Sequence, residues 1–358
     1  MKSFTALTLA ASAALLVTAP AQANGANDFT LPSTPFPSLS LAGDGPNLGG
    51  YILVHYGDDD DGAEMKYRAV RVEMKGTQGD FRYAVSADFK GLLGSDTETI
   101  TTYQDDDLDV STPEVETEND IEVPGTVSLK DANVAWDISD EITATLGRFK
   151  EPVLHSGLHS SSRRLMVERT DNGGGFDDRN AGLMLNGSYG DLQLWVAMQE
   201  GDDGAGAMDE TQTTIRAVYN VMGSAFGKYQ GAYGYEGSNL SIGAASVEDD
   251  AIGLEATAVE VGYVNDGWSL YGDMIDVDDG LSPTSFTVSR VMNSEYEIAV
   301  RMEDDDDDNE TSHMTAGVNW YQGDDGHNLK WQLNFTDSES DDPGEEGSRV
   351  DFGLVWRF

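Results

Sequence analysis

The chain of 358 residues contains no cysteine. A disulfide scaffold, a thiolate zinc site and a thiol nucleophile are therefore all excluded. Basic residues are scarce, with 21 Lys and Arg against 65 Asp and Glu, which gives a formal net charge of -44. This deficit argues against a nucleic-acid partner, because binding to phosphates requires a basic surface that displaces counterions. Long apolar runs are missing as well, since nothing after the first 23 residues approaches the roughly 18 residues of a membrane helix.

The beginning of the chain has the pattern of a secretory signal peptide. Lys2 precedes an apolar run, and an Ala-Gln-Ala motif ends at residue 23, so residues 1–23 are predicted to be removed. Residues 24–47 contain four prolines among small polar residues and predict an irregular lead-in. If residues 48–358 enter a membrane, they must do so as a closed barrel, because lipid offers no partner to open backbone groups.

From residue 48 onward, strand-like runs of about ten residues alternate with polar breaks, as in outer-membrane barrels. The last run is the clearest, with Phe352 and Leu354 on one face and Asp351 and Arg357 on the other. This pattern predicts 16 strands, an even number, as bacterial barrels require. We place them near 48–57, 64–76, 79–91, 125–138, 140–149, 178–189, 191–200, 211–222, 238–247, 252–265, 267–277, 284–292, 294–303, 312–322, 327–337 and 347–358.

The breaks between these runs fall into two alternating classes. Short ones such as 76–80 and 265–267 have compact turn chemistry. The others are longer and acidic, as in 95–124 and 303–310. Short turns at one end and long loops at the other are typical of outer-membrane barrels. We therefore predict an all-β protein, a 16-stranded antiparallel transmembrane β-barrel that crosses the outer membrane of a Gram-negative bacterium many times.

A basic island lies in this acidic chain. Five Lys and Arg stand against two acids between Arg148 and Arg169. Ordered motifs run through and around it: Asp-Ala-Asn-Val-Ala-Trp at 131–136, Gly-Arg-Phe-Lys-Glu-Pro at 147–152, Ser-Ser-Ser-Arg at 160–163, Met-Val-Glu-Arg at 166–169 and Asp-Arg-Asn-Ala-Gly-Leu-Met at 178–184. This set resembles the phosphate-selective porin O/P family of outer-membrane channels.

The resemblance implies a 16-stranded channel whose third loop folds into the lumen. It also implies a homotrimer, contacts with outer-membrane lipid and lipopolysaccharide, and insertion by the barrel-assembly machinery. Trp356 and Phe358 resemble the assembly signal of such barrels. The anion-selective members of the family line the path with arginine and lysine, whereas the loops of this chain are acidic, so the resemblance leaves the selectivity open.

We predict a pore constriction around residues 150–178. Its charged side chains either face the ion path or pair with nearby acids to hold the loop in place, and the sequence favours neither role. The candidates are Arg148, Lys150, Glu151, Arg163, Arg164, Glu168, Arg169 and Arg179. His155 and His159 are interpreted as loop histidines, because Pro152 and Gly157 oppose a regular helix. The glycines at 173–175 predict a flexible bend.

The predicted function is passive diffusion of ions and small hydrophilic solutes through an outer-membrane porin. No Ser/His/acid constellation indicates an enzyme. No cofactor is expected beyond loose binding of divalent cations by the acidic loops. Two alternatives stay open: an anion- or phosphate-selective channel, and a secreted soluble β-protein that binds carbohydrate.

Overall fold

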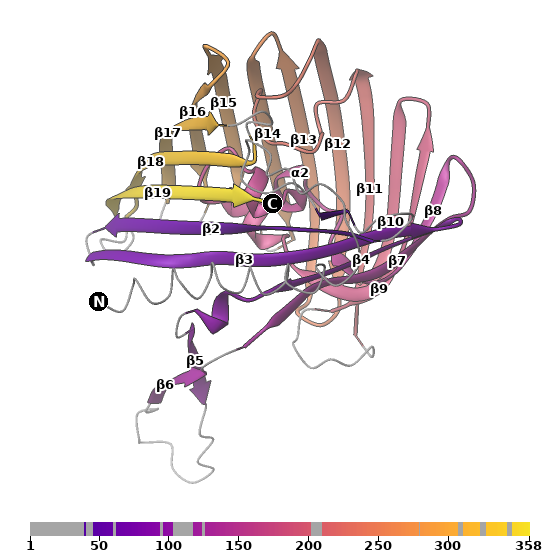
Figure 1. The fold of residues 1–358 in the computed structure, drawn as a ribbon, viewed down its shortest axis with the longest axis horizontal. Coiled ribbons are helices and arrows are strands. Elements are labelled where there is room, and N and C mark those ends of the chain that lie inside the picture. Colours follow the sequence, from indigo (N-terminus) through magenta and orange to yellow (C-terminus); the bar gives the residue numbers. More distant parts are fainter. Residues whose placement is uncertain are drawn as a thin grey trace, which may run out of the picture.

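The structure is a computed structural model that describes residues 39–40, 46–59, 62–93, 96–102, 117–123, 126–201, 210–278, 280–306, 311–322, 327–341 and 346–358. The predicted signal peptide lies outside these residues, as does most of the lead-in. Figure 1 shows strands wrapped into a barrel, with a small two-stranded sheet projecting from it. None of the described helices is long and apolar enough to cross a membrane.

Seventeen strands belong to the large sheet, and one of them, β1 (Leu39–Ser40), is a two-residue addition to β2. The other sixteen form the barrel. They are β2 (Asn47–Asp59), β3 (Gly62–Gln78), β4 (Phe81–Asp88), β7 (Ser128–Asp137), β8 (Ile142–Lys150), β9 (Arg179–Tyr189), β10 (Leu192–Glu200), β11 (Thr211–Met222), β12 (Ser238–Asp249), β13 (Leu254–Asn265), β14 (Trp268–Val277), β15 (Thr284–Met292), β16 (Tyr296–Asp304), β17 (Ser312–Gln322), β18 (Leu329–Glu339) and β19 (Gly347–Arg357).

All neighbouring barrel strands are antiparallel, and the ring closes where β19 pairs with β2, for example Val355 with Leu53. Because every connection reverses direction, connections alternate between the two ends of the barrel. We call the end where β3 meets β4 the turn end and the opposite end the loop end. Closure leaves no open edge among the sixteen barrel strands, which is what a strand-built membrane protein needs.

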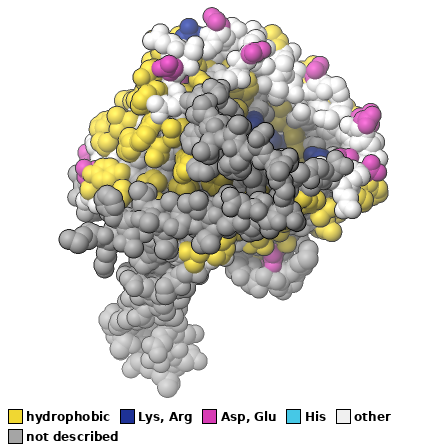
Figure 2. All heavy atoms as spheres, in the orientation of Figure 1, with side chains coloured by type: hydrophobic (Ala, Val, Ile, Leu, Met, Phe, Trp, Pro, Cys, Tyr) yellow, Lys and Arg dark blue, Asp and Glu magenta, His cyan; other side chains and the backbone are white. Residues whose placement is uncertain are grey.

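The outer face of the barrel is apolar and the inner face polar. On β11, Ile215 is 55% exposed, whereas its neighbour Arg216 is 3% exposed. Hydrophobic side chains also stand outward along the other strands, and Figure 2 shows many of them gathered on one side of the molecule. This arrangement inverts that of a soluble protein and fits a barrel whose exterior meets lipid.

Aromatic side chains mark the turn end. Trp136, Tyr189 and Trp268 lie at strand termini there, and Tyr296 stacks on Trp320 with ring centroids 6.1 Å apart. Trp and Tyr collect at membrane interfaces because their rings are apolar and carry one polar group. The turn end therefore coincides with one edge of the hydrophobic band.

The sixteen predicted strands are confirmed, with boundaries that differ by a few residues. The predicted acidic loop 95–124 contains an additional hairpin of β5 (Asp96–Thr102) and β6 (Thr117–Val123). A further 3-10 helix, η2 (Lys90–Leu92), follows β4.

Three short helices lie between β8 and β9. They are α2 (His155–Leu158), η3 (Ser161–Arg163) and α3 (Asp171–Gly175). The prediction of a flexible bend at residues 173–175 is wrong, because the Thr170 side chain accepts a hydrogen bond from the Gly173 amide and caps α3. The interpretation of His155 and His159 is corrected in part, since α2 is a single helical turn that ends before His159.

Candidate functional site

Residues 151–178 join β8 to β9 at the loop end and bond to strands far from both. The Val167 amide donates to Asn334 on β18 at 2.8 Å, and Asn319 on β17 donates to the Leu165 carbonyl at 2.8 Å. Lys330 on β18 donates to the Arg164 carbonyl. These wall side chains satisfy backbone groups of a segment that has little regular structure of its own.

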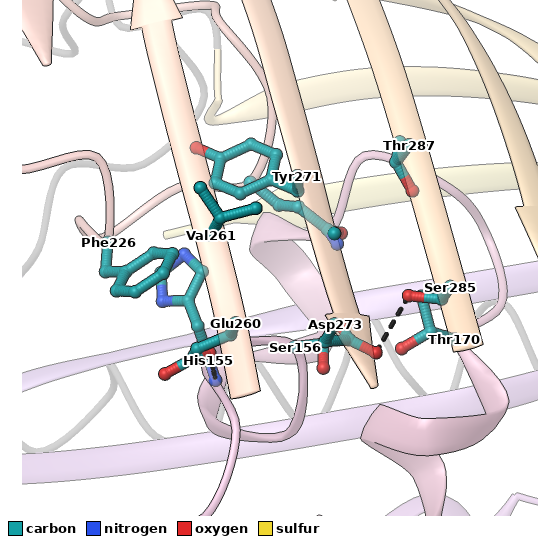
Figure 3. Close-up of a pocket in the computed structure, with 12 residues that line it drawn as sticks. His155, Ser156, Thr170, Phe226, Glu260, Val261, Tyr271, Asp273, Ser285 and Thr287 are labelled. Carbon is teal, nitrogen blue, oxygen red and sulfur yellow. Dashed lines mark hydrogen bonds between the residues drawn. The ribbon is translucent and has the colours of Figure 1, made fainter. Parts of the chain in front are cut away.

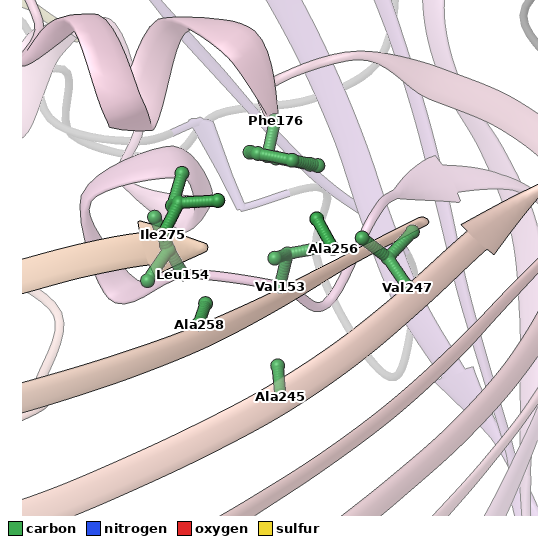
Figure 4. Close-up of a cluster of buried hydrophobic side chains, with 8 residues drawn as sticks. All are labelled: Val153, Leu154, Phe176, Ala245, Val247, Ala256, Ala258 and Ile275. Carbon is green, nitrogen blue, oxygen red and sulfur yellow. The ribbon is translucent and has the colours of Figure 1, made fainter. Parts of the chain in front are cut away.

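The start and end of the segment are anchored by an apolar cluster. Val153, Leu154 and Phe176 pack against small aliphatic side chains of β12, β13 and β14, as Figure 4 shows. The wall residues in this cluster are Ala245, Val247, Ala256, Ala258 and Ile275. Alanines at three of these positions leave room for the segment. Burial of each anchor side chain contributes roughly 1.5–3 kcal/mol.

Two of the predicted site residues tie the segment to itself. Arg169 donates to the carbonyls of Ser156, Gly157 and His159 and pairs with Asp177 at 3.0 Å. Lys150 donates to two of the same carbonyls, those of Gly157 and His159, and lies 3.7 Å from Asp177. Charge-assisted hydrogen bonds of this kind are stronger than neutral ones. Both cations therefore hold the turn around α2 together.

Other predicted site residues connect the segment and its flanking strands to the wall. Glu168 forms an ion pair with Arg68 on β3. Arg179 on β9 pairs with Asp131 on β7 at 2.9 Å. Glu151 is buried, and its amide donates to the Asp178 carbonyl. Arg148 is half-buried on β8, where its carbonyl accepts from Asn133.

A charged cavity of about 410 Å³ lies between the segment and the wall. Five arginines line it: Arg68, Arg164, Arg169, Arg301 and Arg349. Four acids also line it: Glu168, Asp171, Asp177 and Glu303. A second cavity, of about 380 Å³, adjoins Glu168 and Arg349 and extends along His55 and Lys66.

The cations of the segment are close enough to perturb one another. Burial, followed by the charges of Arg169 and Arg68, lowers the pKa of Arg164 to about 9. Burial also lowers the pKa of Arg169, and the neighbouring Asp177 opposes that shift. For Asp171, burial and then the nearby Asp305 raise the pKa. The cavity is therefore lined by charges of both signs in partly desolvated surroundings, where each acts strongly on a small ion.

Two clusters of His and acid side chains lie near this cavity among the described residues. One comprises His55, Glu168 and Asp351, and the other comprises Asp171, Asp305 and His313. In the first, Glu168 already pairs with Arg68, and Asp351 pairs with Arg349 at 2.9 Å. A metal ion would have to compete with both arginines.

The structure thus brings Lys150, Arg164, Glu168 and Arg169 together at the segment. Arg163 lies next to them, with its guanidinium 5.6 Å from the Tyr229 ring. Trp356 and Phe358 are separate from this group, at the turn end, where the Phe358 amide donates to the Gly50 carbonyl at 3.1 Å.

Sequence reasoning missed Arg68, Arg301 and Arg349, which supply most of the wall charge of the cavity. Each lies at an inward position of an otherwise recognisable strand. The available signal was an arginine on the polar face of a strand near its loop end, as in Arg349 two residues before Asp351. That signal does not reveal which of many such positions border the segment.

Comparison with known proteins gives one family and a set of similar folds. The sequence profile of phosphate-selective porin O and P matches residues 51–248, more than half of the chain. A triple mutant of the Rhodopseudomonas blastica porin superposes with a TM-score of 0.55 at 11% identity, covering 87% of this chain and 100% of that one. An anion-selective porin from Comamonas acidovorans gives 0.53 at 14% identity, with 87% and 99% covered. No curated protein matches by sequence.

Proposed function

The chain belongs to the phosphate-selective porin O and P family, and from this premise we propose that residues 151–178 lie in its lumen and form the constriction. The protein is an outer-membrane porin of a Gram-negative bacterium, a passive channel for ions and small hydrophilic solutes. The proposal adds the position of the narrowest part of the pore, which we call the neck, and the side chains that determine its ion selectivity.

The charged cavity beside residues 151–178 is the observation that carries the proposal. Its lining combines side chains of the segment with Arg301 and Arg349 from β16 and β19, so a solute there would meet both. The segment also bonds to β17 and β18, which do not neighbour β8 or β9 in the barrel. A connection that leaves one part of the wall and binds another narrows the space between them.

We further propose that two opposing fields set the selectivity. The acidic loops of this chain favour cations at the mouth, whereas five arginines against four acids in the cavity favour anions slightly. Exposed charges at the mouth are screened beyond about 8 Å at physiological salt, whereas those in a narrow neck are screened less. We expect weak cation preference at low salt that fades or turns toward anions as salt rises.

The alternative of an anion- or phosphate-selective channel rests on the same arginines. It agrees with the family and with the Comamonas acidovorans fold. The first proposal expects a preference for cations at low salt, and the alternative expects a preference for anions. Under the same salt gradient, these two preferences give reversal potentials of opposite sign. A measurement on the parent channel in planar bilayers separates them.

Substitution of the segment arginines tests whether they face the ion path. We expect the triple variant Arg163→Gln, Arg164→Gln and Arg169→Gln to make the channel distinctly more cation-selective. Arg82→Gln is the control, because Arg82 is exposed near the turn end and pairs with Asp137. Equal reversal potentials in all three channels would mean that the segment arginines hold the loop and do not act on the passing ion.

The assembly expectations remain proposals. We propose a homotrimer in contact with outer-membrane lipid and lipopolysaccharide, inserted by the barrel-assembly machinery, with no nucleic-acid partner, no cofactor and only loose divalent-cation binding. The apolar exterior and the aromatic girdle at the turn end support a lipid contact. Chemical cross-linking in intact membranes tests the trimer, and a ladder that stops at the monomer would contradict it.

A further inference from the structure

The connection between β11 and β12 differs from its neighbours at the turn end. β11 ends at Met222 and β12 begins at Ser238, which leaves residues 223–237 between them. By contrast, only residues 266–267 join β13 to β14 at the same end. Since barrel turns at this end are normally short, the long connection requires an explanation.

Residues 223–237 bond to inward-facing side chains of the wall. The Ala225 amide donates to Ser241 on β12 at 2.9 Å, and the Ala225 carbonyl accepts from the Tyr271 hydroxyl on β14 at 3.0 Å. The Ala232 amide donates to Glu297 on β16 at 2.6 Å. Ala225 is fully buried. A connection bonded to three strands across the barrel cannot be an external loop, since the polar face of those strands points inward.

This connection also meets residues 151–178, which arrive from the opposite end. The Gln230 amide donates to the Arg163 carbonyl at 3.2 Å, and the Gln230 Oε1 accepts from the Leu165 amide at 3.0 Å. Gln230 therefore bonds to the backbone on both sides of Arg164. Phe226 packs on the His155 ring with centroids 4.7 Å apart, and Figure 3 shows these rings side by side.

The approach of the two segments is close. The space left between them and the wall, bordered by His155, Phe226 and Gln230, is about 10 Å³, enough for about one water molecule. Gly231 has a φ of 93°, and a Cβ there would lie 2.6 Å from Glu297 Oε1 and 2.9 Å from Leu165 Cδ1. A glycine is needed at this point because any side chain would push the segments apart.

We propose that residues 223–237 form a second lumen segment that enters from the turn end and positions the tip of the constriction, with Gln230 as the positioning residue for Arg164. The inference rests on the proposed function in one respect, namely that residues 151–178 form the neck. The pore is then narrowed from both ends, and the neck keeps its shape because each segment satisfies backbone groups of the other. Loss of the Gln230 contact frees Arg164 on one side while Lys330 still holds its carbonyl.

A labelling experiment tests the contact without using ion flow. Ser162 is 1% exposed, and the chain has no cysteine, so Ser162→Cys provides a single buried thiol beside Arg163. Gln230→Met keeps the size of the side chain and removes the acceptor. Gln322→Met is the matched control, because Gln322 accepts from Trp331 at 2.8 Å at the same end.

We expect thiol labelling of folded barrels to accelerate in the Gln230→Met background and to stay at the parent rate in the Gln322→Met background. An increase of about tenfold corresponds to the loss of one net hydrogen bond of about 1.4 kcal/mol. Equal rates in all three barrels would overturn the proposal. Faster labelling in barrels that carry no current would support the contact and count against the proposed channel instead.

Shortening of the connection tests the narrowing. Replacement of residues 225–235 by an Asn-Gly turn removes one of two segments from the lumen, and we expect single-channel conductance to rise by roughly twofold as the pore widens. Heat-modifiable migration on gels verifies that the variant barrel is closed. An unchanged conductance in a closed variant barrel would refute the second segment as part of the neck.

Discussion

Substitution of Arg169 by Met tests whether this predicted pore residue mainly stabilises the folded conformation of residues 151–178. Arg169 contacts four groups of its own segment: the carbonyls of Ser156, Gly157 and His159, and the carboxylate of Asp177. Methionine fills a similar volume but offers no donor. The perturbation therefore removes hydrogen bonds while leaving the packing largely in place.

The free-energy cost of Arg169→Met depends on which of these contacts Lys150 also makes. Lys150 also donates to the Gly157 and His159 carbonyls, so these two keep a partner in the variant. The Ser156 carbonyl loses a charged donor, at about 1.5–3 kcal/mol. The pair with Asp177 adds at most about 1 kcal/mol, because that carboxylate is 37% exposed. A total of about 3 kcal/mol raises the open population of the segment on the order of 100-fold.

Hydrogen exchange of backbone amides in detergent-folded barrels measures this population. We expect amides of residues 151–178 to exchange on the order of 100-fold faster in Arg169→Met, with strand amides unchanged. Arg82→Met is the control, because Arg82 and Asp137 have side chains 52% and 39% exposed and contribute about 0–1 kcal/mol. The noise of the single-channel current should rise in Arg169→Met and not in Arg82→Met.

The same exchange in Arg169→Met as in Arg82→Met would refute the reasoning. It would mean that the carbonyl contacts around α2 contribute nothing net to the closed segment. Arg169→Lys sharpens the result, since a lysine keeps the charge but cannot span three carbonyls and a carboxylate at once. We expect its exchange rate to lie between those of the parent and Arg169→Met.

Two further outcomes are expected. Gly157→Ala should destabilise the closed conformation of residues 151–178 by about 1–3 kcal/mol, because a Cβ there would lie 2.5 Å from the Phe176 carbonyl oxygen. Gly174→Ala is the control, because a Cβ at that position meets open space. Equal rates of proteolysis in the two variants would contradict this prediction. Acid should loosen the same residues, because burial, then His159 and Arg216, hold the pKa of His155 well below 6.5, and burial lowers the pKa of His159 to about 4. At these two histidines the folded state binds fewer protons than the unfolded state, so their contribution to stability falls as the pH drops below 6.5, whereas the raised pKa of Asp171 acts in the opposite direction. We expect the two histidines to outweigh the single carboxyl, so that amide exchange, corrected for its intrinsic pH dependence, is faster in acid. A flat profile from pH 7 to pH 4 would count against this sign.

The barrel could be predicted because its signal is local. Alternation along β11 places Ile215 outward and Arg216 inward, and the same period recurs along β12, β13 and β16. Turn chemistry then fixes the breaks, as at residues 266–267. Neither signal depends on which distant residues meet, so one sequence was sufficient.

The candidate site could be predicted only in part, because its geometry depends on distant contacts. The basic island identified Lys150 and Arg169, but Asp177, with which both form ion pairs, lies outside any recognisable charge pattern. Arg68 is a hundred residues from Glu168 in sequence, and only closure of the barrel makes them an ion pair. Strand periodicity gives the face of such a residue but not its partner across the lumen.

Residues 223–237 show a different limit. Glycines and tyrosines there obscure the strand pattern, and nothing local distinguishes an external loop from a segment folded into the lumen. The relevant partners, such as Glu297 and Leu165, lie at least 65 residues away. A length of more than ten residues at the turn end was the one available clue.

Inward-facing side chains have different roles at different heights along a strand. Some bond to residues 151–178, and others line the charged cavity. On β18, Lys330 and Gln332 donate to the backbone of residues 151–178, and Asn334 accepts from it. Closer to the loop end, Thr336 and Ser338 line the charged cavity, and among the described residues their side chains bond to Thr315 and His313 of β17. Under the proposed function, we expect charge changes at Arg68, Arg301 or Arg349 to alter which ion permeates. Substitution of Lys330 or Gln332, which bond to the backbone of residues 151–178, should instead change how rigidly that segment is held.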